Sequence, residues 1–123
     1  MDDRQLNVPQ GNCIISEEVI ATIAATAAKE VAGVAGMALR LPELRNLTNA
    51  ASRSVGVINN ENETVVDVYV NLKLGARIPD VAGEVQRAVK AEVQSMTGKP
   101  VTKVNVHVAG VVLEDNEKVE EKK

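Results

Sequence analysis

Residues 65 to 74 read Val-Val-Asp-Val-Tyr-Val-Asn-Leu-Lys-Leu. From Val66 to Leu74 every even position is apolar, whereas the odd positions carry Asp, Tyr, Asn and Lys. Successive side chains of a β-strand point to opposite faces, so this alternation indicates a half-buried strand. The pattern returns at residues 103 to 108, which read Lys-Val-Asn-Val-His-Val. The two strands predict a sheet with one face on a core and the other facing water or a partner.

Two amphipathic helices are predicted, one on each side of the 65–74 strand in the chain. Ser16 is a good N-cap for a helix over residues 16–32, and Glu17 and Glu18 suit its first turn. Gly33 is a natural stop for that helix. A second helix over residues 79–97 begins at Pro79 and ends before Gly98. Its apolar stripe consists of Val81, Val85, Ala88, Val89, Val93 and Met96.

The remaining segments complete an α+β order. Short strands are predicted at residues 12–15, 34–40 and 55–58, with a turn over residues 59–63. The segment 41–54 reads either as a short helix opened by Pro42 or as a loop. We therefore expect a two-layer α+β domain over residues 12–113, with both helices on one face of a mixed or antiparallel sheet. Flexible tails are expected at residues 1–11 and 114–123.

The composition limits the classes of function. The chain has 123 residues, no Phe or Trp and a single Tyr, so branched aliphatic residues and Ala must fill the core of one domain. Its net charge of −3 disfavours general affinity for nucleic acids. The single Cys13 predicts a reduced, cytoplasmic setting. The N-terminus lacks a signal-peptide core, and the longest stretch without a polar residue, residues 31–39, is too short to span a bilayer, which takes about 20 residues.

Motifs for catalysis are scarce. His107 is the only histidine and falls on the polar face of its predicted strand, where the simplest interpretation is an exposed residue without a catalytic partner. Cys13 could pair with His107 in a small enzyme, but a lone cysteine in a short apolar strand is more often a buried small residue. One His and one Cys are too few for a zinc site. The sequence predicts no cofactor, no metal and no catalytic residue.

The sequence Gly33-Val34-Ala35-Gly36 matches the G-x-x-G loop of a KH domain, which joins two helices and clamps the RNA backbone. Here the motif follows a helix but leads into a predicted strand, and no Lys or Arg flanks it closely. A KH-like RNA-binding module is therefore an alternative function, less favoured than a helix stop followed by a strand.

The order of motifs resembles the alkaline shock protein family of Gram-positive bacteria. The resemblance rests on three segments at residues 11–34, 78–98 and 104–111, which begin Gly-Asn-Cys-Ile-Ile-Ser-Glu-Glu, Ile-Pro-Asp-Val-Ala and Val-Asn-Val-His-Val. It covers residues 11–113. It implies an abundant, non-enzymatic cytoplasmic protein linked to cell-envelope stress and held near the membrane by a separate membrane protein. The family supplies no active-site residues to transfer.

The combined hypothesis is an interaction or scaffold protein that acts through its surfaces. We expect self-association and docking to a membrane-anchored protein, without direct insertion into the membrane. The candidate partner surface is the polar face of the sheet, formed by Asp67, Tyr69, Asn71, Lys103, Asn105 and His107. The alternative for this face is plain solvation, because antiparallel sheets commonly leave one face in water. Free strand edges offer a second route to self-association.

Overall fold

The computed structural model describes residues 13–41, 46 and 49–113. Along the chain these residues form α2 (Glu17–Lys29), β1 (Val34–Met37), α3 (Ala50–Ser54), β2 (Val55–Asn59), β3 (Thr64–Lys73), α4 (Ile78–Thr97) and β4 (Lys103–Val112). The predicted α+β class is confirmed. Both expected tails, residues 1–11 and 114–123, lie outside the described residues.

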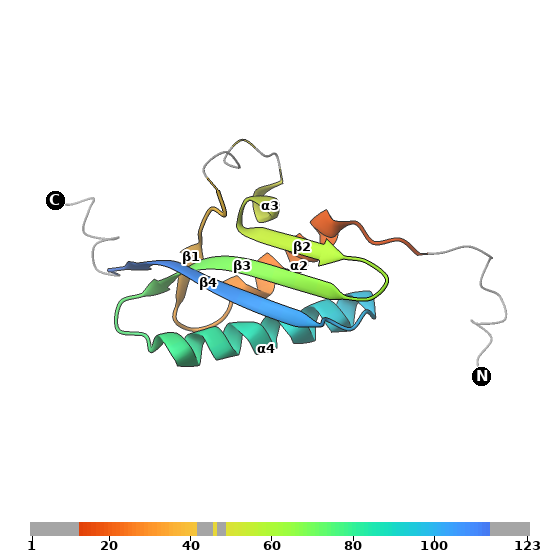
Figure 1. Cartoon of the computed structure of the whole chain (residues 1–123). Helices are drawn as coiled ribbons and strands as arrows, with labels where there is room; N and C mark the ends of the chain where they lie inside the picture. Colours follow the sequence, from red (N-terminus) through yellow and green to blue (C-terminus); the bar gives the residue numbers. More distant parts are fainter. Residues whose placement is uncertain (1–12, 42–45, 47–48, 114–123) are drawn as a thin grey trace.

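The sheet is mixed and is centred on β3 (Figure 1). β1 and β2 both pair with β3 antiparallel, β2 along its first half and β1 along its second half. β4 pairs with β3 in parallel, from Val65 opposite Lys103 to Lys73 opposite Val112. Parallel neighbours need a crossover connection, which α4 provides. The long strand that the alternation predicts is therefore the one strand that contacts all the others.

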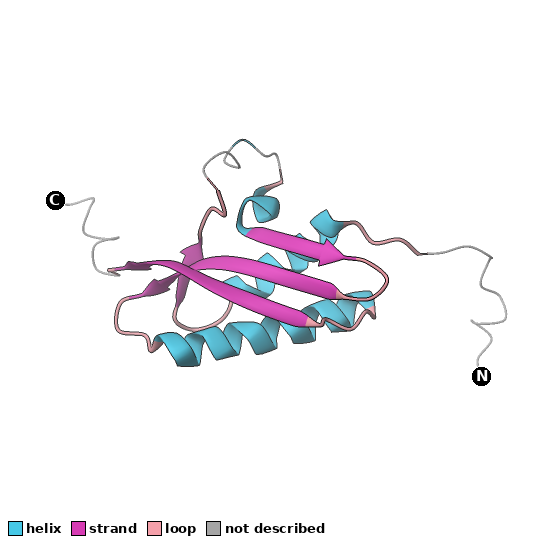
Figure 2. Ribbon diagram, in the orientation of Figure 1, coloured by secondary structure: helices cyan, strands magenta, loops and turns pink. Residues whose placement is uncertain are grey.

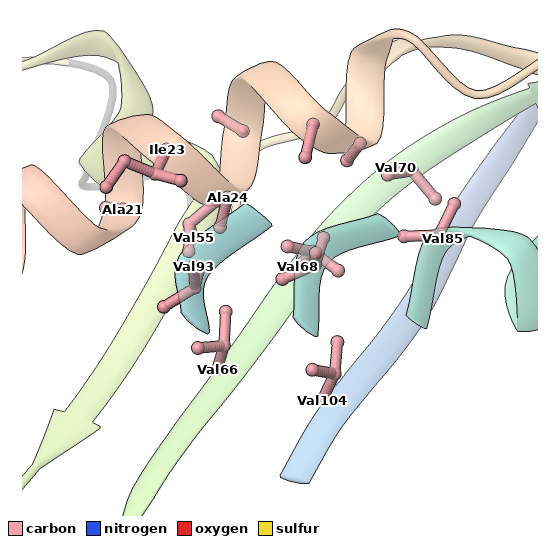
Figure 3. Packing of buried hydrophobic residues seen from close by; sticks show 14 of the residues in the cluster. Ala21, Ile23, Ala24, Val55, Val66, Val68, Val70, Val85, Val93 and Val104 are labelled. Atoms are coloured by element: carbon pink, nitrogen blue, oxygen red, sulfur yellow. The ribbon is translucent and has the colours of Figure 1, made fainter. Parts of the chain in front are cut away.

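Both long helices cover the same face of the sheet (Figure 2). Side chains of α2 and α4 point toward the valines of β3 and β4 (Figure 3). Val66, Val68 and Val70 of β3 are fully buried, as are Val85 and Val89 of α4. The aliphatic core that the composition requires is thus a layer of valine between helices and sheet, lined on the α2 side by Ile20 and several alanines. The prediction that both helices share one face is confirmed.

The helix ends follow local chemistry. The Ser16 hydroxyl accepts a hydrogen bond from the Val19 N–H at 3.3 Å, which caps α2. α2 ends at Lys29, earlier than predicted, and Gly33 instead occupies the turn into β1 with φ of +99°. α4 ends at Gly98, whose φ of +76° is left-handed, as predicted for a helix-stop glycine.

Two local predictions are wrong, and a segment that the sequence leaves open between helix and loop contains a helix. Residues 13–15 form no strand, and Cys13 is exposed instead of buried. Met96 was assigned to the apolar stripe of α4, but its side chain faces solvent because the stripe ends at Val93. The segment 41–54 contains the short helix α3, which begins after Asn49, whereas Pro42 lies outside the described residues. The Asn49 side chain caps α3 by accepting from the Ser52 N–H at 3.1 Å.

Candidate functional site: the open face of the sheet

No described helix or strand covers the face of the sheet that lies away from the helices. All six residues of the predicted polar surface lie there, because they alternate with the buried valines of β3 and β4. The register of β3 with β4 sets these residues side by side, with Asp67 beside Asn105 and Tyr69 beside His107. Lys103 lies beside Val65 of β3. We call this surface the polar sheet face and define it as Asp67, Tyr69, Asn71, Lys103, Asn105 and His107.

Asp67 joins two neighbours on β4. Its Oδ1 accepts a hydrogen bond from Nδ2 of Asn105 at 2.8 Å and lies 3.3 Å from Nε2 of His107. The side chains of His107 and Asp67 are 43% and 30% exposed, so this contact is open to water. A carboxylate between an amide and an imidazole fixes both β4 side chains relative to β3.

Tyr69 stacks on His107. The two rings are nearly parallel, with 5° between their planes and 4.2 Å between their centroids. The two stacked rings come from the adjacent strands β3 and β4, and together they form one continuous amphipathic surface. Aromatic rings that expose one side and anchor the other are common at protein interfaces.

Two features at the margins of the polar sheet face were missed at the sequence level. Ile58 of β2 lies in the outer row next to Val65, and its side chain is 51% exposed while Val65 is buried. At the other end, Gly110 leaves room for Asn71, since a Cβ on Gly110 would lie 3.1 Å from the Asn71 Oδ1. A bulge in the pairing of β4 with β3 between Val70 and Asn71 sets this position. The β-bulge has no sequence signal that alternation alone could reveal.

The geometry does not assemble a catalytic centre. Within residues 13–41, 46 and 49–113, no hydroxyl or thiol is hydrogen-bonded to His107, and no group of three His, Cys, Asp or Glu side chains is placed to hold a metal ion. Cys13 precedes α2 in the chain, whereas His107 is on the open face. The Cys13–His107 pair of the less favoured enzyme alternative is not formed in the described part of the chain. The expectation that His107 has no partner is also wrong, because Asp67 lies beside it.

The G-x-x-G segment is structural in this fold. Gly33 lies in the turn before β1, and Gly36 lies within β1 and opposite Asn71. A Cβ on Gly33 would lie 2.7 Å from Cγ2 of Val81, so this glycine allows the turn to pack on α4. A loop that clamps RNA must stand open between two helices, and this one is closed against the core.

A hollow of about 620 Å³ opens between α2, the end of β1, and α3. Lys29 and Arg53 line it together with the hydroxyls of Thr22 and Thr26. Each of these hydroxyls donates to a helix carbonyl at 2.9 Å. Among the described lining residues there is no carboxylate, imidazole or thiol, so none of them supplies a carboxylate–imidazole or thiol–imidazole pair. No helix in the described ranges is long and apolar enough to cross a membrane.

The chain is similar to bacterial proteins and to solved structures. The YloU protein of Bacillus subtilis is 35% identical over 113 residues, which cover 87% of this chain and 93% of YloU. The Spy1535 protein of Streptococcus pyogenes is 32% identical over 111 residues, covering 88% of this chain and 84% of the relative. Among solved structures, the manganese form of the MamM C-terminal domain variant E289D matches with a TM-score of 0.49 and 16% identity, over 77% of this chain and 99% of that domain.

A family model for proteins with a cell envelope-related function matches residues 5–113 of the chain. That span contains every described helix and strand, and it includes the segments on which the sequence resemblance rests. The chain belongs to the alkaline shock protein family, a family with a cell envelope-related function.

Proposed function

We propose that this protein is a non-enzymatic interaction domain of the cell envelope, which associates with itself and docks onto a membrane-anchored protein. The observation that carries the proposal is the polar sheet face, where Asp67 and Tyr69 of β3 hold Asn105 and His107 of β4 in a fixed arrangement. Ordered polar and aromatic groups on an uncovered face suit recognition of another protein.

We propose a protein intermediary because the chain has few of the features by which proteins bind lipid directly. A membrane-surface helix is typically rich in Lys and Arg with bulky apolar residues beneath them. α2 carries Lys29 alone among basic residues, and its buried face is made mostly of alanine that packs in the core. The net charge of −3 also disfavours anionic lipid. A cytoplasmic protein of this kind reaches the membrane through a partner.

The absence of enzymatic activity is part of the proposal. The Asp67–His107 contact is the one arrangement on this face that resembles a catalytic pair, and it lies on an open sheet surface. A general base needs an enclosed substrate position and a group to deprotonate, and neither is found in the described part of the chain.

The test combines the pure protein with cells. Flotation of the purified chain with vesicles of phosphatidylglycerol and phosphatidylcholine should leave it in the soluble fraction. Membrane fractions from cells should retain it until membrane proteins are digested by protease. Flotation of the pure protein with the vesicles would contradict a protein intermediary, and retention after the digestion would point to lipid binding.

A further inference from the structure

We propose that β4 pairs antiparallel with β4 of a second copy, so that two four-stranded sheets join around a two-fold axis at His107. The proposal concerns the pure chain and does not depend on a membrane partner. Its basis is the outer edge of β4, which pairs with β3 alone. In the ranges that the structure describes, no strand lies beyond it.

Between Lys103 and the bulge beyond Val108, this edge lacks the features that usually prevent pairing. Natural edge strands are protected by Pro, by Lys or inward-pointing charges, by bulges or by short length. β4 is ten residues long, and between Val104 and Val112 it contains neither Pro nor a charged residue. Its one irregularity is the bulge beyond Val108. The stretch from Val104 to Val108 is therefore a straight, neutral edge.

Backbone direction identifies the groups that are free to pair. Alternate residues of a strand turn their N–H and C=O groups to opposite edges. Nε2 of Gln86, on α4, donates to the Val104 carbonyl at 3.0 Å, which places Val104 in the set that faces away from β3. Val106 and Val108 follow with the same orientation. No side chain of the described residues is hydrogen-bonded to either of them.

These two residues select one register. Antiparallel pairing of Val106 with the second copy's Val108 uses both residues of each copy and leaves the Gln86 hydrogen bond intact. It places His107 opposite its own counterpart in a pair without direct hydrogen bonds, where Cα atoms are about 4.5 Å apart. A register centred on Val106 would need the Val104 carbonyl, and one centred on Val108 would need Gly110 across the bulge.

The side chains beside the edge fit a second copy. Val106 and Val108 are half-buried on the helix side, whereas Val104 is buried under α4. Pairing in the proposed register would cover these valines with the same valines of the partner. Two copies of the same edge that pair antiparallel around a two-fold axis are complementary to each other by symmetry. A strand of a different protein would need its own sequence to fit the same register. The joined sheet would carry both polar sheet faces on one side.

Cysteine cross-linking tests the register. In a Cys13→Ser background, His107→Cys should form a disulfide-linked dimer under mild oxidation, because disulfides need Cα atoms roughly 4.4–6.8 Å apart. Asn105→Cys is the control, since its two copies would be offset by four residues, about 14 Å along the strand at about 3.4 Å per residue. Equal linking at both positions, or none at His107→Cys, would overturn the register.

The oligomeric state tests the edge itself. The purified chain should have twice its monomer mass by light scattering. Asn105→Lys with Ala109→Lys would place like charges opposite one another across the axis and should yield monomers with an unchanged circular dichroism spectrum. Ile58→Lys with Asn71→Lys adds the same charge on β2 and β3 and should stay dimeric. A wild-type monomer at every concentration, or a dimer that survives the β4 lysines, would refute the proposal.

Discussion

The Tyr69 ring lies flat against the His107 imidazole, at 4.2 Å between centroids, while Asp67 Oδ1 lies 3.3 Å from Nε2 of the same imidazole. His107 is thus held by two neighbours from the adjacent strand. An imidazole that is fixed but open to water has the properties of a contact residue, because little side-chain entropy is left to lose on binding.

A substitution of Asp67 distinguishes a role of the polar sheet face in partner binding from a role in the stability of the fold. Asp67→Ala removes the acceptor for Asn105 and His107, and we expect the free energy of unfolding to fall by no more than about 1 kcal/mol because the contact is solvent-exposed. Membrane recruitment in cells should fall, since both β4 side chains lose their anchor. Asp80→Ala, which breaks the exposed Arg77–Asp80 pair at 3.1 Å, is the control. Equal recruitment of both variants would argue against the polar sheet face.

The valine layer should respond to a single truncation. Val89 is fully buried between α4 and the sheet, so Val89→Ala should lower the free energy of unfolding by roughly 1–3 kcal/mol through lost contacts and a small cavity. Urea denaturation monitored by circular dichroism measures the change. Met96→Ala on the same helix should cost less than about 0.5 kcal/mol, because Met96 is exposed. A loss below a few tenths for Val89→Ala would mean that the position is not core.

Two glycines in one motif should behave differently. Gly33→Ala introduces a Cβ at a left-handed φ and 2.7 Å from Cγ2 of Val81, so it should cost about 2 kcal/mol or more. Gly36→Ala meets no atom within 4 Å and has an ordinary φ, so its cost should be small. Equal thermal stability of the two variants would contradict the close approach of the turn to α4.

The same motif bears on nucleic-acid binding. Net charge −3 and a single aromatic residue predict affinity for single-stranded RNA no tighter than the non-specific range, with Kd on the order of 10⁻⁴ to 10⁻⁶ M at physiological salt. A fluorescence titration measures it. Submicromolar binding that Gly36→Asp abolishes would revive the KH-like alternative.

Strong periodicity explains why much of the fold is readable from sequence. Val66, Val68 and Val70 alternate with polar residues, and Val81, Val85, Val89 and Val93 recur every fourth residue, so each set defines one buried face. The capping residues Ser16 and Gly98 then fix one end of each long helix. These patterns can be identified from neighbouring residues in the chain, and the residues that they mark as apolar are the ones that the fold buries.

The features that sequence reasoning missed or left open depend on contacts between distant residues. The parallel direction of β4 is set by the α4 crossover, and alternation is the same for parallel and antiparallel neighbours. Asp67 meets His107 only because the register places Asp67 beside Asn105 and Tyr69 beside His107. Cys13 looked buried because Ile14 and Ile15 follow it, yet the side chain of Ile14 is 87% exposed. A short apolar run without a partner strand carries no information on burial.

The sharpest test of the partner surface is a change that alters the polar sheet face without touching the core. Tyr69→Glu with Asn105→Glu removes the stacking ring and one hydrogen bond to Asp67, and it adds two negative charges beside that carboxylate. The buried valines behind the face are unchanged, so the protein should fold. We expect the cellular pool of the double variant to move from the membrane fraction to the soluble fraction.

The matched control adds the same charge on the helix side. Ala91→Glu with Ser95→Glu changes two exposed positions of α4, at the opposite surface of the molecule, and should leave the membrane pool intact. Light scattering of both variants shows whether release reflects a lost partner contact or a lost dimer, because the proposed pairing of the β4 edge uses the backbone of Val106 and Val108. Membrane retention of the Tyr69–Asn105 variant would exclude the polar sheet face and shift the partner contact to another surface.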